Sequence, residues 1–267
     1  MGVGAFIDDL IPIIAKFPNH QDITVYPIAD LHVGSPQFDI KKWDAFRSKL
    51  STEPNSRIVI VGDMMNNAVK SGKSNVYEEA MRPSQQKQWL VEQLSPIADR
   101  ILCGCSGNHE QRSSKEVDDN PLFDVFAKLN IEHLYRENGC FLLMRYGEGH
   151  EQAGKTRPCY ATFVTHGVGG GMYVGTGGNK AERLGSVMDG LDCIIAGHVH
   201  KPTEFPVEKI LIDKRNNNII QQQFRVVIAT SWLKFGGYGL RAMFTPTAFL
   251  LHEITYSADQ KLIRVTA

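Results

Sequence analysis

The stretch that decides the fold is Ile23–His32 (ITVYPIADLH), in which a short apolar run ends in an Asp-Leu-His cluster. Apolar runs of this kind, β-branched in part and bounded by polar residues, are typical of strands in a covered sheet. In such sheets, functional side chains gather in the loops at the carboxyl ends of the strands. We therefore predict that Ile23–Ala29 is a strand and that Asp30 and His32 belong to a functional site.

The same pattern recurs along the chain. Polar clusters directly follow the predicted strands Arg57–Val61, Tyr160–Val164 and Asp192–Ala196, and another follows Arg100–Cys105 after a single Ser106. Five strand ends would therefore bring Asp, Asn and His side chains to one place. The further clusters are Gly62-Asp63, Gly107-Asn108-His109-Glu110, Thr165-His166-Gly167 and Gly197-His198-Val199-His200.

The residue types in these clusters suit a metal centre. Carboxylate and amide oxygens and imidazole nitrogens are ligands for Mn, Fe, Zn, Ni or Mg. Each cluster alone has a simpler interpretation, because an Asp after a strand is often a helix cap or a turn residue, and an H-x-H is often a surface pair. Five of the nine histidines lie in these clusters, and the recurrence at five strand ends favours the metal centre.

The order D-x-H, G-D, G-N-H-E, H and G-H-x-H resembles that of the calcineurin-like metallophosphoesterases, from about Asp22 to His200. The resemblance implies a four-layer αββα sandwich of two mixed sheets flanked by helices. It also implies an enzyme with two divalent metal ions, Mn before Fe, Zn, Ni or Mg. The first metal would be held by Asp30, His32, Asp63 and His200, and the second by Asp63, Asn108, His166 and His198, with Asp63 bridging.

The resemblance also gives roles to side chains that are not ligands. His109 would be the catalytic residue, facing the substrate and donating a proton to the leaving oxygen. Glu110 would orient a histidine, and Asn66 stands in a supporting position where relatives often carry an acid. Arg112 would contact a phosphate oxygen, with a surface salt bridge as an equally weighted alternative. The reaction would be attack on phosphorus by a hydroxide bridging two metals about 3.5–4 Å apart.

The motifs favour a phosphodiesterase or nuclease. Asp30-Leu31-His32-Val33-Gly34 resembles the opening motif of DNA-repair nucleases in this superfamily, and the late G-H-V-H suits its diesterase branches. The serine/threonine phosphatase pattern is absent, because Met64-Met65-Asn66 follows Asp63 where those enzymes carry D-R-G, and Ser106 replaces an Arg. The alternatives are a phosphomonoesterase or protein phosphatase and, with less weight, a non-catalytic scaffold, which would usually have lost ligands.

The charge composition limits the classes of partner that the chain is expected to bind. The 267 residues include 29 Lys and Arg and 29 Asp and Glu, and the pI is about 7.1. This balance argues against strong, sequence-independent binding of nucleic acid, because such binding depends on clustered cations. It does not exclude a local basic groove. A phosphate ester is the expected substrate, nucleic acid is a candidate substrate, and a second copy of the chain is a candidate partner.

The chain is expected to form one domain over residues 1–267, because it shows no internal repeat and no Pro/Ser linker. Gly4–Phe17 predicts an amphipathic helix, so residues 1–20 would form a helical extension. This segment lacks the basic start of a signal peptide, and Phe6 stands where myristoylation needs Ser or Thr. No stretch approaches transmembrane length, so no membrane role is expected.

The remaining pattern is α/β early and β-rich late. A helix between the first two strands gives a β-α-β unit with a right-handed parallel crossover. Helices are predicted at Phe38–Leu50, Val76–Leu94 with a break near Pro83, Asn120–Asn130 and Lys180–Val187. Further strands are predicted at Phe141–Tyr146, Glu204–Ile212, Ile219–Thr230 and Thr247–Thr255.

Three loops are expected beside the site. Ala68–Asn75 is polar. His166–Asn179 is glycine-rich, matches neither nucleotide-binding glycine motif, and is interpreted with equal weight as a flexible turn or as a mobile loop that approaches the phosphate. Trp232–Arg241 could stack a base, although a surface loop is favoured. The cations and aromatics of these loops are Lys70, Lys73, Lys234 and Arg241 with Tyr173, Trp232 and Tyr238.

The five cysteines include no C-x-x-C pair. An odd set without such a pair predicts a reducing compartment, with neither a disulfide framework nor a structural zinc site. Cys103 and Cys193 lie inside predicted strands, where a free thiol behaves as a small apolar side chain. A cytoplasmic protein is therefore expected.

Overall fold

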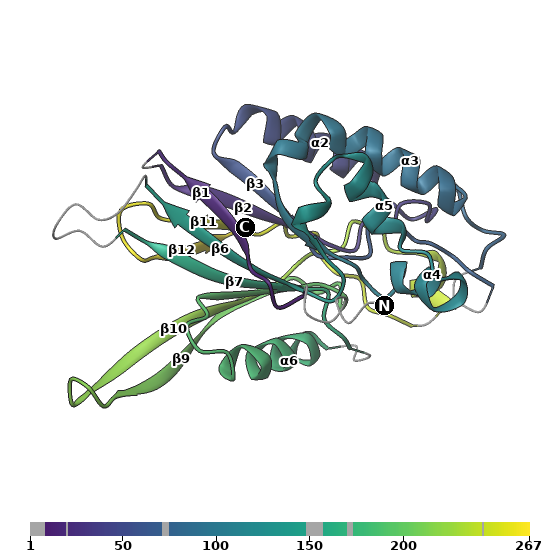
Figure 1. Cartoon of the computed structure of the whole chain (residues 1–267). Helices are drawn as coiled ribbons and strands as arrows, with labels where there is room; N and C mark the ends of the chain where they lie inside the picture. Colours follow the sequence, from purple (N-terminus) through teal and green to yellow (C-terminus); the bar gives the residue numbers. More distant parts are fainter. Residues whose placement is uncertain (1–8, 20, 71–74, 148–156, 170–172, 242) are drawn as a thin grey trace.

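Two mixed β-sheets form the centre of the structure, which is a computed structural model that describes residues 9–19, 21–70, 75–147, 157–169, 173–241 and 243–267. Within these residues each sheet has six strands (Figure 1). The first sheet has the order β1 (Ile13–Phe17), β6 (Cys140–Tyr146), β7 (Cys159–Thr165), β8 (Cys193–Ala196), β10 (Asn218–Ile228) and β9 (Thr203–Asp213). The second has the order β12 (Ile263–Thr266), β11 (Glu253–Tyr256), β2 (Ile23–Ile28), β3 (Ser56–Ile60), β4 (Ile101–Cys105) and β5 (Tyr135–Arg136).

Helices cover the outer face of each sheet, and the two sheets face one another, which gives four layers (Figure 1). This arrangement confirms the predicted αββα sandwich. The second sheet is covered by α2 (Ile40–Thr52), α3 (Pro83–Leu94) and α5 (Pro121–Lys128), and the first by α6 (Val174–Ser186). Shorter helices are η1 (Ser95–Arg100), α4 (Glu110–Val117), η2 (Glu132–Leu134) and α7 (Gly237–Arg241).

An apolar core fills each interface between layers. Val59 of the second sheet and Ile195 of the first lie in the cluster between the sheets. Trp43 of α2 lies in the cluster outside the second sheet, and Phe224 lies against α6 outside the first. Burying a side chain of this size stabilises the fold by about 1.5–3 kcal/mol. The layers therefore hold the strand ends in a fixed frame.

The strands that carry the polar clusters end at a common edge. β2, β3 and β4 run parallel, as do β7, β8 and β10, so the carboxyl ends of each set lie together. Main-chain pairing continues beyond β2 and β3, because Asp30 N donates to Gly62 O over 3.1 Å and Val33 pairs with Met65. The first two clusters are thus joined by backbone before their side chains enter the site.

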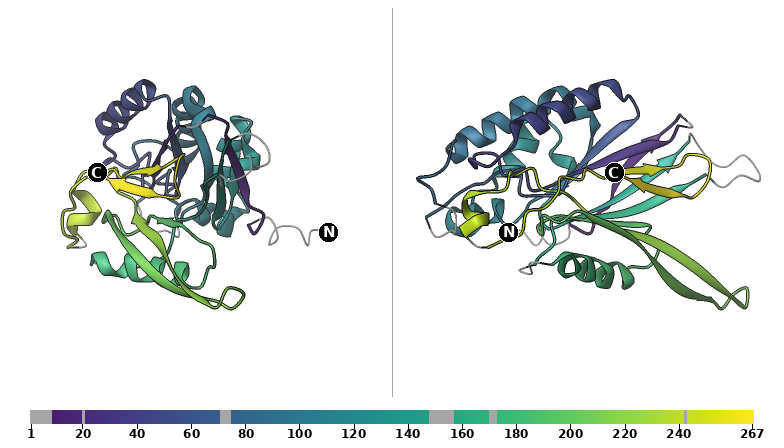
Figure 2. Two further views of the ribbon diagram at one scale, coloured as in Figure 1. Left: turned by 90° about the vertical axis from the view of Figure 1, so that its left-hand side faces the viewer. Right: turned by 180° about the vertical axis from the view of Figure 1, so that it is seen from behind.

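The β9–β10 hairpin projects beyond the other strands of the first sheet (Figures 1 and 2). Its two strands pair from Thr203 and Ile228 at the base to Asp213 and Asn218 near the tip. Only the base of the hairpin packs into the core, since the tip extends past the layers that cover the other strands. The hairpin tip points away from the strand ends that carry the polar clusters.

The predicted helix at Gly4–Phe17 is wrong where the structure describes it. Residues 1–8 lie outside the described residues, and Ile13–Phe17 forms β1, which pairs in parallel with β6 at the edge of the first sheet. Ile13 and Phe17 are buried in the core between the sheets, whereas Ile14 is exposed. Two adjacent β-branched residues suit a pleated edge strand better than a helix. The single domain over residues 1–267 stays a prediction.

Other predicted elements differ at their ends. The predicted helix Val76–Leu94 begins only at Pro83, because the residues before it form a turn in which Glu78 N donates to Asn75 O. The predicted strand Thr247–Thr255 is reduced to β11. The helix expected at Lys180–Val187 is α6, which begins earlier, at Val174, so the glycine-rich stretch is partly helical.

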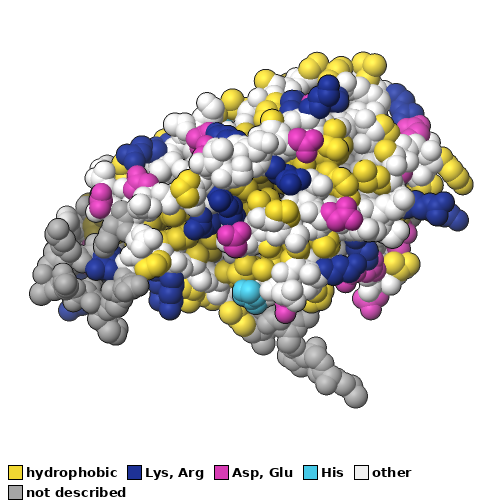
Figure 3. All heavy atoms as spheres, turned by 90° about the horizontal axis from the view of Figure 1, so that it is seen from above, with side chains coloured by type: hydrophobic (Ala, Val, Ile, Leu, Met, Phe, Trp, Pro, Cys, Tyr) yellow, Lys and Arg dark blue, Asp and Glu magenta, His cyan; other side chains and the backbone are white. Residues whose placement is uncertain are grey.

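The helix-covered surface carries charges of both signs and also exposes hydrophobic side chains (Figure 3). Lys and Arg side chains are interspersed with Asp and Glu over the face formed by α2 and α3 (Figure 3). A mixed surface of this kind agrees with the balanced charge of the sequence. Among the helices that the structure describes, none has the length and apolar character needed to cross a bilayer.

Candidate metal centre

The structure brings all seven predicted ligands to one edge of the two sheets. Asp30 and His32 follow β2, Asp63 follows β3, and Asn108 lies between β4 and α4; His166 follows β7, and His198 and His200 follow β8. Their contacts with one another form two groups, and Asp63 of the second group also lies beside His32 of the first. His32, Asp63 and His109 form a further set that overlaps both groups.

Five of these seven residues have a left-handed backbone. The φ angles are 52° for Asp30, 49° for His32, 51° for Asp63, 71° for His198 and 56° for His200. A non-glycine residue in this region costs about 1–3 kcal/mol and persists only where the surrounding structure fixes it. Strain of this kind clusters at functional sites. The backbone therefore points to the same edge of the sheets as the side chains do.

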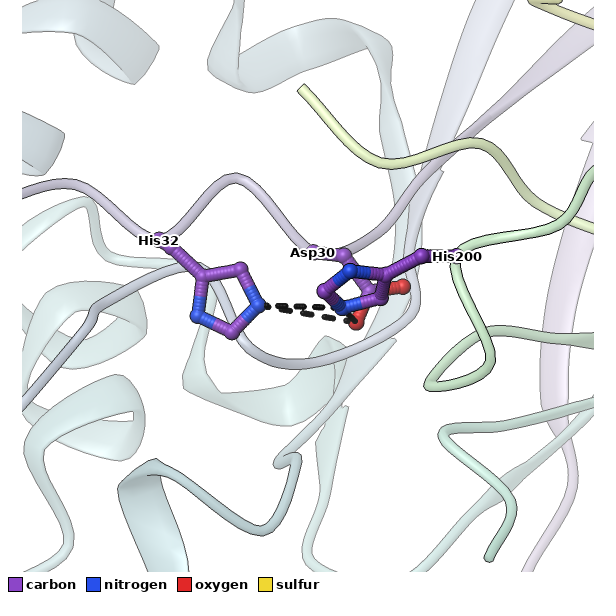
Figure 4. Close-up of side chains that lie close together, drawn as sticks. All are labelled: Asp30, His32 and His200. Carbon is purple, nitrogen blue, oxygen red and sulfur yellow. Dashed lines mark hydrogen bonds and ion pairs between the residues drawn. The ribbon is translucent and has the colours of Figure 1, made fainter. Parts of the chain in front are cut away.

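The first group contains Asp30, His32 and His200 (Figure 4). His200 Nε2 lies 3.0 Å from Asp30 Oδ1 and 3.2 Å from His32 Nε2. His32 Nε2 lies 3.8 Å from Asp30 Oδ1 and 3.9 Å from Asp63 Oδ2. The loops after β2 and β8 thus point their ligand atoms at a common point, with Asp63 beside it.

The second group contains Asp63, Asn108, His166 and His198. His166 Nε2 is at its centre, 3.2 Å from Asp63 Oδ2, 3.1 Å from Asn108 Oδ1 and 3.2 Å from His198 Nδ1. The contact between Asp63 Oδ2 and His32 Nε2 joins this group to the first. The Asp63 carboxylate therefore lies between the two groups, as the bridging assignment requires.

The tautomers of two histidines fit a bound cation. His166 Nδ1 donates to Val61 O over 2.8 Å, and His198 Nε2 donates to Gly169 O over 2.7 Å. A ring nitrogen that is fixed by a carbonyl in this way leaves the opposite nitrogen as the ligand atom. When both rings are neutral, the lone pairs of His166 Nε2 and His198 Nδ1 face one another at 3.2 Å, an arrangement that a cation, or a proton on His166, would stabilise.

Charge in the site also fits a cation. The buried Asp30 Oδ1 accepts no hydrogen bond of good geometry, although His200 Nε2 is 3.0 Å away. Burial opposes the charged form of His166, yet the carboxylates of Asp63 and Asp30 raise its pKa to about 10. Two buried carboxylates therefore attract positive charge here, and the oxygen and nitrogen donors suit divalent Mn, Fe, Zn, Ni or Mg.

Glu110 supports the ligand loops through their backbone. The sequence predicted that it orients a histidine, but its buried carboxylate instead accepts from the N–H groups of Asp63, Met65 and Gly107 at 2.9–3.0 Å. Burial and the nearby Asp63 carboxylate raise the pKa of Glu110 to about 7. Its oxygens therefore hold together the loops after β3 and β4, which carry Asp63 and Asn108.

His109 lies at the edge of the site, beside the ligands. Its backbone N donates to Asp63 Oδ1 over 2.8 Å, and its Nδ1 donates to Asn66 O over 2.7 Å. Arg112 Nη2 lies 2.9 Å from His109 Nε2, and because a guanidinium only donates, Nε2 is the acceptor. Arg112 thus contacts His109 and is not limited to a surface salt bridge. The Asn66 side chain bonds the Glu79 carboxylate, while its backbone carbonyl serves His109.

A cavity of about 430 Å³ opens over the two groups. Part of its wall comes from the predicted loop Trp232–Arg241, which includes α7 and was expected beside the site, and part from later residues up to Phe249, which were not. The later part of this wall carries no local motif, because it consists of scattered apolar and polar residues. The wall includes Phe235, Phe244, Phe249, Lys234 and Arg241, with Lys201 next to His200.

The loop predictions have mixed outcomes. Trp232 cannot stack a base, because it is fully buried and packs edge-on against Trp43 and Phe46. Lys234 and Arg241 do line the cavity. Tyr173 is exposed and begins α6 as its N-cap, whereas Lys73 and the side chain of Tyr238 lie outside the described residues.

Carboxylate, amide and imidazole side chains that gather at the strand ends of an αββα sandwich are the kind of donor set that a metal-dependent hydrolase uses. The chain belongs to the calcineurin-like phosphoesterase family, whose model matches residues 23–202. It is therefore an enzyme that hydrolyses phosphate esters, and the family implies two divalent metal ions.

The chain was also compared with solved structures and with curated proteins. A matching solved structure is that of the calcineurin-like phosphoesterase YfkN from Bacillus subtilis, at 12% sequence identity and a TM-score of 0.38. That match covers 93% of this chain and 91% of the other. None of the curated proteins compared with the chain gives a significant match.

Proposed function

We propose that this phosphoesterase cleaves phosphodiesters and that single-stranded or nicked nucleic acid is its leading natural substrate. The observation that carries the proposal is the wall of the cavity. Phe235 and Phe244 are about half exposed there, at 51% and 47%, and Lys234 and Lys201 lie beside them. Ring faces for bases and cations for a backbone are the combination by which proteins bind single strands.

The ligand assignment follows the two groups. The first metal is assigned to Asp30, His32, Asp63 and His200, and the second to Asp63, Asn108, His166 and His198. When bound, the two cations supply a water of lowered pKa and neutralise charge on the phosphoryl oxygens. Mn²⁺ is the first choice, with Fe, Zn, Ni and Mg as alternatives that metal analysis of the purified protein would separate.

The protein side chains act on the leaving group and the phosphate. His109 faces the cavity and is assigned to protonate the leaving oxygen or to stabilise its charge. In the present arrangement its Nε2 accepts from Arg112, so Arg112 has to turn toward a phosphate oxygen, and Nε2 has to take up a proton from solvent, before that nitrogen can protonate the leaving oxygen. Arg112 is thereby assigned both to hold His109 and to bind phosphate.

We expect a diester to be preferred over a protein-bound monoester. A diester carries a substituent on both sides of phosphorus, and the cavity of about 430 Å³ lies in the range for small-molecule sites. Lys42 and Lys234 are both near Asp39, and Arg241 pairs with Glu78, so much of the local positive charge is balanced. We therefore expect weak, salt-sensitive binding of nucleic acid.

The test compares a diester with the matching monoester. The wild-type protein with Mn²⁺ should hydrolyse bis-nitrophenyl phosphate faster than nitrophenyl phosphate, and it should cleave a labelled single-stranded oligonucleotide. The Asp63→Ala variant is the control for a contaminating phosphatase. A preference for the monoester together with an intact oligonucleotide would replace this proposal with the phosphomonoesterase alternative.

A further inference from the structure

A buried amide lies behind His109, outside the candidate ligands. Gln86 of α3 is 0% exposed, and its side chain is fully hydrogen-bonded. Its Oε1 accepts from Asn67 N over 3.0 Å, and its Nε2 donates to Met81 O over 2.7 Å and to Glu79 Oε2 over 2.8 Å. A buried polar network that is fully satisfied rigidifies the segments it joins.

Gln86 also packs against the loop after β2, which carries Asp30 and His32. Gly34 has φ of +98°, and a Cβ added there would lie only 2.1 Å from Gln86 Nε2. The Gly34 carbonyl accepts from Ala80 N over 2.8 Å, which holds the two segments in this close approach. The glycine that ends Asp-Leu-His-Val-Gly is therefore required by contact with Gln86, and Gln86 touches the loops after both β2 and β3.

The network reaches His109 through one peptide unit. Asn66 O accepts from His109 Nδ1 over 2.7 Å, while Asn67 Nδ2 donates to His109 O over 2.8 Å and to Ser113 Oγ over 2.9 Å. Asn67 adopts a left-handed φ of +42°. This strained turn is held from outside by two contacts, Gln86 on Asn67 N and the Glu79 carboxylate on Asn66 Nδ2.

We propose that Gln86 is a positioning residue for His109, acting through the Asn66–Asn67 turn. The inference rests on the proposed function of His109. Only a neutral amide meets the local demand, because the site needs one acceptor for Asn67 N and two donors for Met81 O and Glu79. A carboxylate at this position would face the Glu79 carboxylate, and an apolar side chain would leave buried groups unpaired.

The experiment is a double-mutant cycle on diphenyl phosphate, whose leaving group needs protonation more than nitrophenolate does. Gln86→Met keeps the length of the side chain and should lower kcat about 10- to 100-fold, with KM and metal content nearly unchanged. In a His109→Ala background the same change should have almost no further effect. Gln88→Met, on the exposed face of α3, is the matched control and should behave like wild type.

Additive effects of Gln86→Met and His109→Ala, or wild-type turnover by Gln86→Met, would overturn the inference. Glu79→Gln provides a second, less buried variant if Gln86→Met fails to fold, and its effect should likewise depend on His109. Nitrogen NMR of the imidazole rings gives a readout without turnover: the His109 Nδ1–H signal should shift in Gln86→Met and not in Gln88→Met. If wild type hydrolyses no phosphodiester, the proposed function fails. An unshifted His109 signal separately contradicts the positioning role.

Discussion

At the scale of single residues, the site depends on positions that only glycine can occupy. A Cβ added at Gly107 would lie 2.1 Å from Asp63 Oδ1, and one at Gly197 would lie 3.0 Å from Asp30 Oδ2. The glycines beside the ligands therefore make room for the carboxylates of neighbouring loops. The sequence motif combines ligands with the small residues that let the ligands approach one another.

Asp63 is the residue whose loss should affect both metals. Its carboxylate lies between the two groups, 3.2 Å from His166 Nε2 and 3.9 Å from His32 Nε2. Asp63→Ala is therefore expected to bind fewer than one metal ion per chain where wild type binds two. Elemental analysis of both proteins after identical purification provides the measurement. Two ions at full occupancy in the variant would rule out the bridging role.

His109 should affect turnover without affecting the metals. His109→Ala is expected to keep both ions and to slow hydrolysis by about 10²–10⁴-fold, the usual contribution of general acid–base catalysis. The loss should be smaller for esters of nitrophenol, which leaves without protonation. Rates on a series of aryl diesters check this expectation, and equal losses across the series would argue against a proton-donating role.

At the scale of elements, α6 shows how packing overrides helix propensity. The helix contains several glycines, each of which costs about 1 kcal/mol relative to alanine in a helix interior. Gly185 lies against the buried Phe224, where an added Cβ would be 2.4 Å from the ring, and Gly177 lies against Val199. Glycine is needed at these positions because the helix lies very close to the first sheet and to the loop of His198.

Two alanine substitutions in α6 should therefore have opposite effects. Gly185→Ala is expected to destabilise the protein by about 1–2 kcal/mol, because the clash with Phe224 outweighs the gain in helix propensity. Gly175→Ala should be neutral or stabilising by up to about 1 kcal/mol, since the nearest atom to an added Cβ belongs to Asn179 at 3.9 Å. Denaturant unfolding of the two variants measures both values, and a stabilised Gly185→Ala would contradict the packing argument.

At the scale of the whole molecule, the junction of the two sheets contains a titratable group that the reaction does not use. His252 is buried immediately before β11 of the second sheet, and Glu204 of β9 in the first sheet acts on it electrostatically. Burial lowers the pKa of His252 below its usual value, although the Glu204 carboxylate works in the opposite direction. The folded protein therefore keeps this ring neutral at a pH where the unfolded chain has already taken up a proton.

The difference in protonation of His252 between the folded and unfolded states sets the direction in which the free energy of unfolding changes with pH. Below the unfolded pKa of about 6.5, the unfolded chain binds a proton that the folded one does not, so the free energy of unfolding falls as the pH falls. His252→Asn should show a smaller loss between pH 7.5 and 5.5 than wild type. Unfolding both proteins in the same metal-free buffer isolates the difference, and parallel pH profiles would show that His252 does not contribute.

The five cysteines are free thiols, and four of them are buried. Cys103, Cys105, Cys140 and Cys193 are buried free thiols, and Cys159 is an exposed one. Burial raises the pKa of Cys193 to about 12, so this thiol stays protonated and acts as a small apolar side chain. A reducing compartment stays a prediction.

Local patterns in the sequence predicted where the strands end and which polar side chains follow them. Apolar runs such as Ile23–Ala29 alternate with short polar clusters, and a run of that kind forms a strand wherever both of its faces are covered. Because Asp30 and Asp63 directly follow their strands, local order along the chain was enough to predict that they meet. The family of the chain and the αββα architecture follow from the same local signals.

Only the tertiary structure decided what surrounds the ligands. β1 could not be told from a helix, since its strand conformation depends on pairing with β6, far along the chain. Phe244 in the cavity wall and Gln86 behind His109 belong to no motif, and each acts through contacts with residues distant in sequence. Local propensity reflects interactions between residues that are close together in the chain. Burial, shared hydrogen bonds and close contacts between distant residues arise only when the layers pack.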